Sequence, residues 1–184
     1  MKNTLAAQKT PGTEDLKTTS YTGDYGLTLV EMAPVGVIGA IIPVTNPAAT
    51  VINNVIGMIA AGNGVVFCPH PSAEKTSLKA IEILHEAIVS SGGPSGLVVG
   101  LKAPSIEKAN QLMSHKGIDM LVVTGGGGVV KAALSSGKKA IGAGAGNPPV
   151  LVDHTADVDK AARDIVMGAS FDNNMPCICE KVLI

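Results

Sequence analysis

A strand–helix–strand pattern runs through residues 35–68, VGVIGAIIPVTNPAATVINNVIGMIAAGNGVVFC. The apolar residues Val35–Ile42 predict a strand that ends at Pro43, because proline has no N–H to donate to a sheet. Thr50–Ala61 then has helical spacing of its apolar positions and is closed by Gly62. Val65–Cys68 predicts a second buried strand. A helix between two such strands is the connection that parallel strands require.

The same alternation continues to residue 168. Ser72 is the expected N-cap of a helix that ends before Gly92. Further strands are expected at Leu97–Val99, Met120–Val123, Lys139–Ile141 and Val150–Val152, and further helices at Ser105–Ser114, from about Val129, and at Asp157–Gly168. Strands and helices that alternate in this way predict an α/β fold with a Rossmann-like, mostly parallel sheet covered by helices on both faces.

Both ends of the chain depart from this pattern. Residues 1–26 are polar and rich in turn residues, and a strand is expected to follow at Leu27–Met32. Residues 178–184 predict a strand with no later partner, so we expect it to join an earlier strand or another molecule, and we expect the chain to be a fragment. The predicted domains are therefore residues 1–26, 27–168 and 169–184.

Composition excludes several classes of function. The 184 residues are 46% hydrophobic, enough for one sizeable core. A formal net charge of -1, two Phe, two Tyr and no Trp argue against nucleic-acid binding. The longest apolar run, Val35–Val44, is too short to cross a membrane. Three cysteines are typical of a reducing compartment, and we expect a soluble cytoplasmic protein.

Two glycine-rich runs follow predicted strands, Thr124–Gly128 and Gly142–Asn147. Ligands of parallel sheets bind at the carboxyl ends of strands, where glycine lets backbone N–H groups approach a phosphate. Neither run has the full G-x-G-x-x-G pattern, and tight turns also use glycine. A nucleotide-binding role and a simple turn role both stay open.

Cys177 is the candidate nucleophile, in the proline-containing segment Asn173–Cys177. The alternative is a small packed side chain, because free cysteines are commonly buried. Cys179 forms a C-x-C pair with it, but no further ligands stand at zinc spacing. Cys68 ends a predicted buried strand and is expected to be a packing residue. None of the four histidines has a spacing that indicates a general base.

Several sequence blocks resemble the aldehyde dehydrogenase family in their order: Glu31–Gly39, Pro43–Pro47, Ala60–Asn63 and Pro69–Pro71. Three later blocks look like its CoA-acylating branch, the propionaldehyde and acetaldehyde dehydrogenases of propanediol and ethanolamine utilisation: Thr124–Gly128, Gly142–Pro149 and Asn173–Cys177. The resemblance runs from about Thr10 to the last residue.

The resemblance implies an oxidoreductase in which the Cys177 thiolate attacks a short-chain aldehyde. A hydride then passes to NAD, with NADP as the alternative, and the thioester on Cys177 passes to coenzyme A. It implies the Cys177 N–H and the side chain of either Thr45 or Asn46 as donors to the oxyanion. The residues that it implies for cofactor binding are Pro43, Thr45, Pro69, His70, Pro71, Thr124, Gly125, Gly126, Val129, Gly142, Ala143 and Gly144.

Two positions depart from the hydrolytic members of the family. Gly142 stands where they have a glutamate that activates water, so the resemblance favours acyl transfer to CoA over hydrolysis. Pro71 lies near the position of their ribose-binding glutamate, which leaves the choice between NAD and NADP open.

The same resemblance implies that residues 169–184 begin a truncated catalytic domain, so we expect little turnover from this chain alone. It also implies a homo-oligomer in the full-length form and association with a bacterial microcompartment. Two alternatives remain: a non-catalytic nucleotide-binding or assembly module of the same fold, and a hydrolytic aldehyde dehydrogenase. The length of the aldehyde chain stays open.

Overall fold

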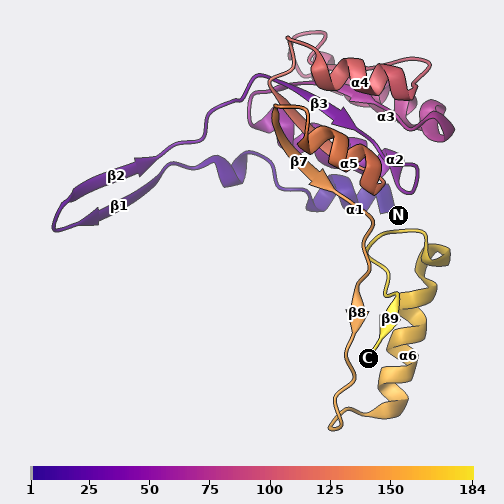
Figure 1. Ribbon diagram of the computed structural model, residues 1–184. Coiled ribbons are helices and arrows are strands. Elements are labelled where there is room, and N and C mark those ends of the chain that lie inside the picture. The colour runs from indigo at the N-terminus through magenta and orange to yellow at the C-terminus, as the bar shows by residue number, and fades with distance from the viewer. Residues whose placement is uncertain (1) are drawn as a thin grey trace. The chain divides into compact units, whose positions relative to one another are not determined.

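The computed structural model describes residues 2–184, which form two compact units that divide between Ala143 and Gly144 (Figure 1). Unit 1 ends at Ala143, and unit 2 is Gly144–Ile184. Unit 1 contains the main sheet, and unit 2 contains one long helix with a two-stranded sheet. The domain boundaries predicted at residues 26 and 168 stay a prediction. Within residues 2–184, the longest helices are either too short or too polar to span a membrane.

The main sheet of unit 1 has five parallel strands. They are β3 (Val37–Ile41), β4 (Gly64–Cys68), β5 (Val98–Gly100), β6 (Met120–Thr124) and β7 (Lys139–Ala143). Their order is β5-β4-β3-β6-β7, and each neighbouring pair is parallel. The chain adds β4 and then β5 on one side of β3, and then crosses to the other side of β3, where it adds β6 and β7. This doubly wound arrangement confirms the predicted fold class.

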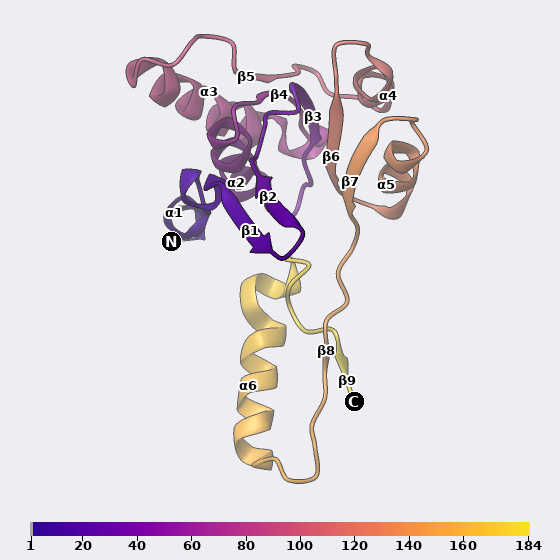
Figure 2. The same ribbon diagram turned by 90° about the vertical axis from the view of Figure 1, so that its left-hand side faces the viewer.

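Four helices cover the two faces of this sheet. Figure 2 shows α2 (Pro47–Ala60) and α3 (Glu74–Ser90) on one side, and α4 (Ile106–Ser114) and α5 (Gly127–Leu134) on the other. Successive strand residues point to opposite faces, so Ile38, Ala40 and Ile42 pack with the α2 and α3 side, whereas Ile41 packs with the α4 and α5 side.

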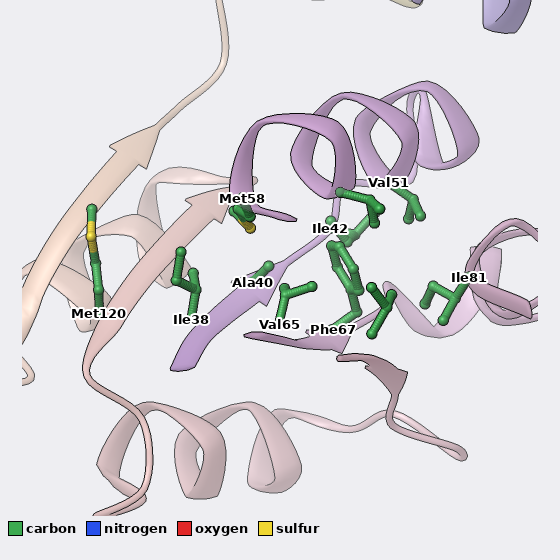
Figure 3. Packing of buried hydrophobic residues seen from close by; sticks show 11 residues of the cluster. Ile38, Ala40, Ile42, Val51, Met58, Val65, Phe67, Ile81 and Met120 are labelled. Carbon is green, nitrogen blue, oxygen red and sulfur yellow. The ribbon is translucent and has the colours of Figure 1, made fainter. Parts of the chain in front are cut away.

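Phe67 lies at the centre of the first of these cores (Figure 3). Its side chain is 0% exposed and is packed among residues of the sheet and of α2 and α3, including Ile42, Val51 and Ile81. Truncation of such a residue to alanine typically costs about 3–5 kcal/mol. The strand–helix–strand pattern of residues 35–68 thus forms the core from which the sheet is built.

Asn63 joins the end of α2 to the start of β3. Its Oδ1 accepts the N–H groups of Val35 at 2.6 Å and Gly36 at 3.0 Å, and its Nδ2 donates to the Met58 carbonyl at 3.2 Å. The side chain is only 5% exposed. Because a buried amide is costly unless it is hydrogen-bonded, these contacts fix how the chain enters the central strand.

The N-terminal segment is more regular than the sequence predicts. It contains α1 (Lys2–Lys9), a 3₁₀ helix (Thr13–Leu16) and β1 (Thr19–Gly23), where only polar turns were expected. The strand expected at Leu27–Met32 is β2 (Gly26–Val30), which pairs antiparallel with β1. All residues of both strands are exposed, so β1 has no buried apolar face that could have marked it in the sequence.

Unit 2 consists of β8 (Pro149–Val150), α6 (Val158–Ser170), a 3₁₀ helix (Phe171–Asn174) and β9 (Val182–Leu183). The expected strand at Val150–Val152 is not part of the main sheet. It forms the parallel pair β8·β9, so the C-terminal strand joins an earlier strand, one of the two predicted outcomes. The strand itself is shorter than residues 178–184, because a turn occupies its expected first half.

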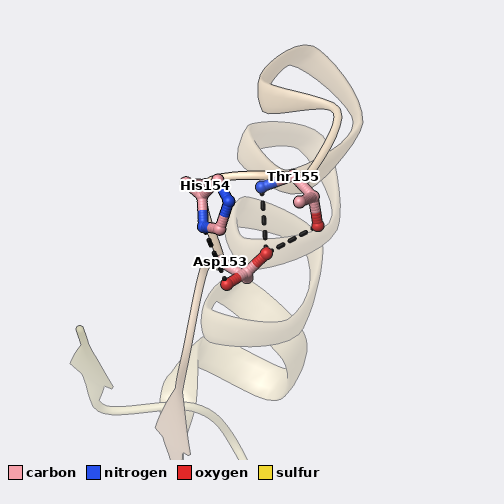
Figure 4. Close-up of polar contacts among 3 residues, drawn as sticks. All are labelled: Asp153, His154 and Thr155. Carbon is pink, nitrogen blue, oxygen red and sulfur yellow. Dashed lines mark hydrogen bonds and ion pairs between the residues drawn. The ribbon is translucent and has the colours of Figure 1, made fainter.

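The turn before α6 is held by polar contacts (Figure 4). Asp153 Oδ1 accepts the Thr155 hydroxyl at 2.6 Å and the Thr155 N–H at 2.9 Å, and His154 Nδ1 lies 3.3 Å from Asp153 Oδ2. These bonds lower the pKa of Asp153, with the Thr155 hydroxyl as the largest cause. Two residues later, Asp157 caps α6 by accepting the Lys160 N–H.

The expected start of one helix is wrong. Ser72 is not an N-cap; its N–H donates to His70 Nδ1 at 3.1 Å, and Pro71–Ala73 forms a short 3₁₀ helix. The α-helix α3 begins at Glu74 instead. A helix start at which a histidine ring nitrogen accepts the backbone N–H has no common sequence signature. The sequence pattern therefore placed the N-cap at Ser72.

Candidate functional site

The predicted cofactor residues follow the carboxyl ends of four neighbouring strands. Pro43 and Thr45 follow β3, residues 69–71 follow β4, residues 124–126 end β6 and lead into α5, and Gly142 and Ala143 end β7. Val129 lies in the first turn of α5. Unit 1 therefore brings these residues to one edge of the sheet, on both sides of the point where the strand order reverses, and this edge is where doubly wound sheets bind nucleotides. Gly144 belongs to unit 2.

The glycine-rich run after β6 leads directly into a helix. Gly126 precedes α5, and its carbonyl accepts the N–H groups of Val129 and Val130. The Gly125 N–H donates to the Ala143 carbonyl at 3.0 Å, which joins the loops after β6 and β7. At positions 126–128 an added Cβ would meet nothing within 4 Å, so the backbone there is open to a ligand. N–H groups at a helix start lack intrahelical acceptors, and this arrangement fits a pyrophosphate.

Gly125 and Gly142 are also required by packing. A Cβ on Gly125 would lie 2.9 Å from Val129 Cγ1, and one on Gly142 would lie 2.7 Å from Val130 Cγ1. Both contacts bring α5 close to the strands β6 and β7. Tight packing against α5 and the approach of a ligand can therefore both require glycine at these positions, because a glycine has no side chain to cover its backbone.

Thr45 and Asn46, the two candidate oxyanion donors, form a pair at the start of α2. The Thr45 hydroxyl donates to Asn46 Oδ1 at 3.1 Å. The Asn46 carbonyl accepts both the N–H and the hydroxyl of Thr50, whereas its side chain makes no capping bond to the helix. A hydroxyl has one proton, so Thr45 has already used its donor, but the Asn46 amide carries two.

Cys177 is exposed and lies in a tight turn of unit 2. The Cys179 N–H donates to the Pro176 carbonyl at 3.3 Å, so the backbone folds back across Cys177. The preceding residues Asp172, Asn173 and Asn174 all have left-handed backbone angles, with φ of 48°, 54° and 58°. Such angles cost on the order of 1 kcal/mol or more per non-glycine residue and occur at functional sites when the surroundings enforce them.

Asn174 and Lys181 enforce this conformation. Asn174 Nδ2 donates to the Ala169 carbonyl at 2.7 Å and to the Glu180 carbonyl at 3.1 Å, which connects the end of α6 to the segment after Cys177. Lys181 Nζ donates to both the carbonyl and the Oδ1 of Asn174. Sequence reasoning did not single out Lys181. The tolerance of Asn for left-handed angles was the one available signal for the neighbouring turn.

Gly146 lies directly against the turn that carries the candidate nucleophile Cys177 (the nucleophile turn, residues 172–179). A Cβ at this position would be 2.1 Å from the Cys177 carbonyl oxygen and 3.1 Å from the Cys177 Cβ. The last glycine of the run 142–147 is therefore explained by a backbone contact to the turn that carries Cys177, and not by a phosphate.

The other two thiols are packing residues. Cys68 is 2% exposed in the core between the sheet and α4, as predicted, and burial raises the pKa of its thiol, partly offset by Lys108. Cys179 is also 2% exposed, and its thiol donates to the Phe171 carbonyl at 3.3 Å. No cluster of three or more metal-ligating side chains occurs among residues 2–184. Cys177 is thus the one accessible thiol in this part of the chain.

Comparison with known proteins identifies the family of this chain. The family model described as the aldehyde dehydrogenase family matches residues 4–184. The chain belongs to the aldehyde dehydrogenase family. This aldehyde dehydrogenase chain is 57% identical to acetaldehyde dehydrogenase (acetylating) EutE of Salmonella typhimurium. The match covers all 184 residues of this chain and 39% of EutE.

Two solved structures are similar to the aldehyde dehydrogenase chain throughout. Rhodopseudomonas palustris propionaldehyde dehydrogenase with bound propionyl-CoA is 58% identical with a TM-score of 0.94, over 99% of this chain and 40% of that one. A propionaldehyde dehydrogenase from the Clostridium phytofermentans fucose utilisation microcompartment is 58% identical with a TM-score of 0.93, over 99% of this chain and 42% of that one. The chain spans about two fifths of the length of these relatives.

Proposed function

We propose that this chain supplies the nucleotide-binding sheet and the nucleophile of a CoA-acylating aldehyde dehydrogenase. The reaction converts a short-chain aldehyde, CoA and NAD to acyl-CoA and NADH. The observation that carries the proposal is an exposed Cys177 in an enforced, strained turn, in a chain similar over 99% of its length to a propionaldehyde dehydrogenase with bound propionyl-CoA.

Cys177 is the proposed acyl carrier. Its thiolate attacks the aldehyde carbonyl carbon, and the carbonyl oxygen becomes an oxyanion on a tetrahedral thiohemiacetal. A bound nicotinamide cofactor would supply the acceptor for the hydride of this carbon, which turns the thiohemiacetal into a thioester. The thioester that remains on Cys177 is then attacked by the thiol of CoA, and the Cys177 thiolate leaves as acyl-CoA forms.

The oxyanion needs hydrogen-bond donors, and we assign the backbone N–H of Cys177 to this role. Of the two side-chain candidates, Asn46 is the better donor. Its Oδ1 accepts the only hydroxyl proton of Thr45, and its side chain is not used to cap α2, so the amide protons remain for a ligand. Thr45 is then the residue that orients the Asn46 amide.

Gly142 favours acyl transfer over hydrolysis. A glycine cannot remove a proton from water, so the thioester has time to react with CoA. Val130 supports this assignment, because its Cγ1 lies 2.7 Å from the place of a Cβ at position 142 and leaves little space for a longer side chain. The hydrolytic alternative would need a base that this position does not provide.

The proposed nucleotide site is the edge of the sheet formed by the ends of β3, β4, β6 and β7. Gly126 and the start of α5 would hold the pyrophosphate through backbone N–H groups, and His70 and Pro71 would lie toward the adenosine. Gly125 would shape this loop, because its own N–H donates to the Ala143 carbonyl. The position at residue 71 has no carboxylate to bind ribose hydroxyls or to repel a 2′-phosphate, so it does not distinguish NAD from NADP. We propose NAD as the cofactor, with NADP as the alternative.

We further propose that the full-length enzyme is a cytoplasmic homo-oligomer associated with a microcompartment. A 58% identical relative from a bacterial microcompartment supports the proposed microcompartment association. Size-exclusion chromatography with light scattering on a full-length version would test the oligomer, and a monomer would exclude it.

Binding and product analysis test the proposed function. Calorimetry with NADH and with CoA should detect binding to the chain, and absence of both at millimolar concentration would contradict it. A full-length version should release acyl-CoA from propionaldehyde, whereas release of free acid would favour the hydrolytic alternative. If the chain is a non-catalytic assembly module, Cys177→Ala should change none of these measurements.

A further inference from the structure

The Lys181 ammonium contacts the backbone of the nucleophile turn. Its Nζ donates to the Asn174 carbonyl oxygen at 3.2 Å, to the Pro176 carbonyl oxygen at 3.5 Å, and to Asn174 Oδ1. None of the three acceptors is a carboxylate, so these contacts are hydrogen bonds to the turn and not a surface ion pair. The Lys181 backbone is fixed too, since its N–H donates to the Pro148 carbonyl at 3.0 Å.

The Pro176 carbonyl and the Cys177 N–H belong to the same peptide group. No cis peptide bond occurs among the described residues, so this carbonyl and this N–H point in opposite directions. Two donors meet the Pro176 oxygen, the Lys181 ammonium at 3.5 Å and the Cys179 N–H at 3.3 Å. Donation to a carbonyl polarises the peptide group and strengthens its N–H as a donor.

We propose that Lys181 is a positioning residue that orients and polarises the Pro176–Cys177 peptide, so that the Cys177 N–H serves as the oxyanion donor. The proposal rests on the proposed role of Cys177. Lys181 acts at the carbonyl edge of the peptide group, opposite the N–H that would contact the oxyanion, and its hydrogen bonds go to Asn174 and Pro176 and not to the thiol. Its contacts to Asn174 hold the preceding left-handed residues in place, which keeps the peptide plane from rotating.

Two reactions of the Cys177 thiol separate this role from a general effect on the fold. Acylation by p-nitrophenyl acetate passes through a tetrahedral oxyanion, whereas alkylation by iodoacetamide is a direct displacement without one. Neither reagent needs CoA or a nicotinamide cofactor. Each rate is measured by mass spectrometry of the peptide that contains Cys177, at a pH high enough that the rate no longer increases with pH. A difference in the fraction of thiolate between variants then does not affect the comparison.

Lys181→Met keeps most of the side-chain length and removes the ammonium. Acylation of Cys177 in Lys181→Met should be about tenfold slower than in the unmodified chain, which is less than the effect of removing an oxyanion donor altogether. Alkylation should stay within about twofold of the rate in the unmodified chain. Lys181→Arg keeps a cationic donor and should recover most of the acylation rate. Lys160→Met is the matched control, because Lys160 also lies in unit 2 but pairs with Asp164 on α6.

An equal loss in both reactions would show that Lys181 acts on the fold or exposure of the turn and would overturn the proposal. It would also be overturned if neither rate changed, or if the ester failed to acylate Cys177 in the unmodified chain. The proposed function is judged separately with propionyl-CoA. If propionyl-CoA leaves Cys177 unmodified while the ester distinguishes Lys181→Met, the CoA function fails and the positioning role stands.

Discussion

A Cβ on Gly146 would lie 2.1 Å from the carbonyl oxygen of Cys177, so these two residues meet backbone to backbone. No side chain can be accommodated at this distance, because the atom that it would meet is a backbone carbonyl oxygen and not the end of a flexible side chain. The glycine-rich loop after β7 and the nucleophile turn are therefore shaped by one another within unit 2.

Gly146→Ala should displace the turn that carries Cys177. A displacement of about 1 Å near a reacting group can slow a reaction on the order of 100-fold, so acylation of Cys177 by p-nitrophenyl acetate should fall at least tenfold. Gly57→Ala is the matched control, since a Cβ there meets nothing within 4 Å and the residue lies inside α2. Gly57→Ala should stabilise the chain by about 0.5–1 kcal/mol and leave the acylation rate of Cys177 unchanged. Equal acylation rates in Gly146→Ala and the unmodified chain would contradict this account of the contact.

The three thiols should differ sharply in reactivity. Cys177 is exposed, whereas Cys68 and Cys179 are each 2% exposed. Iodoacetamide at neutral pH should therefore modify one cysteine quickly in the folded chain and all three in denaturant, as counted by mass spectrometry. Rapid modification of Cys179 in the native state would show that the nucleophile turn opens.

Gly142→Ala should destabilise the chain through Val130. The new Cβ would lie 2.7 Å from Val130 Cγ1, and overpacking of this kind typically costs about 1–3 kcal/mol. The double variant Gly142→Ala with Val130→Ala should lose less than the sum of the two single losses, measured by urea unfolding. Strict additivity would mean that the two positions are not in contact.

Cys68 should make stability depend on pH in the alkaline range. Burial raises the pKa of its thiol above the ordinary value of 9.0, so the unfolded chain loses this proton before the folded chain does. The contribution is fully present below about pH 9 and is lost as the pH rises through the folded-state pKa. The stability difference between the unmodified chain and Cys68→Ala should accordingly shrink above this pH, and a difference that stays constant would exclude the effect.

The sequence predicted the main sheet well because its signals are local and repeated. Val65–Cys68 and Met120–Val123 are short apolar runs bounded by turn residues, and both are central strands of the sheet. The hairpin strand β1 was missed because residues such as Thr19, Ser20 and Thr22 are polar and every position is exposed. Strands without a buried face leave no periodic signal.

The places of the candidate site residues in the fold could be predicted in part for the same reason. Loops that follow strands can be located from the strands, so the positions of Pro43, Thr124 and Gly142 at one sheet edge could be predicted. Lys181 and Gly146 could not, because their roles depend on contacts across a turn whose left-handed residues have no fixed sequence pattern. The alternating strand expected from Ile178 onward failed at the same turn, where Ile178 is exposed and Cys179 is buried.

Acyl transfer from an acyl-CoA to the chain shows directly whether Cys177 is the acyl carrier. The chain is incubated with propionyl-CoA or acetyl-CoA, digested without reducing agents that cleave thioesters, and examined by mass spectrometry. One acyl group should appear on the peptide that contains Cys177, should be released by added CoA, and should be absent in Cys177→Ala. Acylation confined to other residues, or no adduct in a chain that binds CoA, would contradict it.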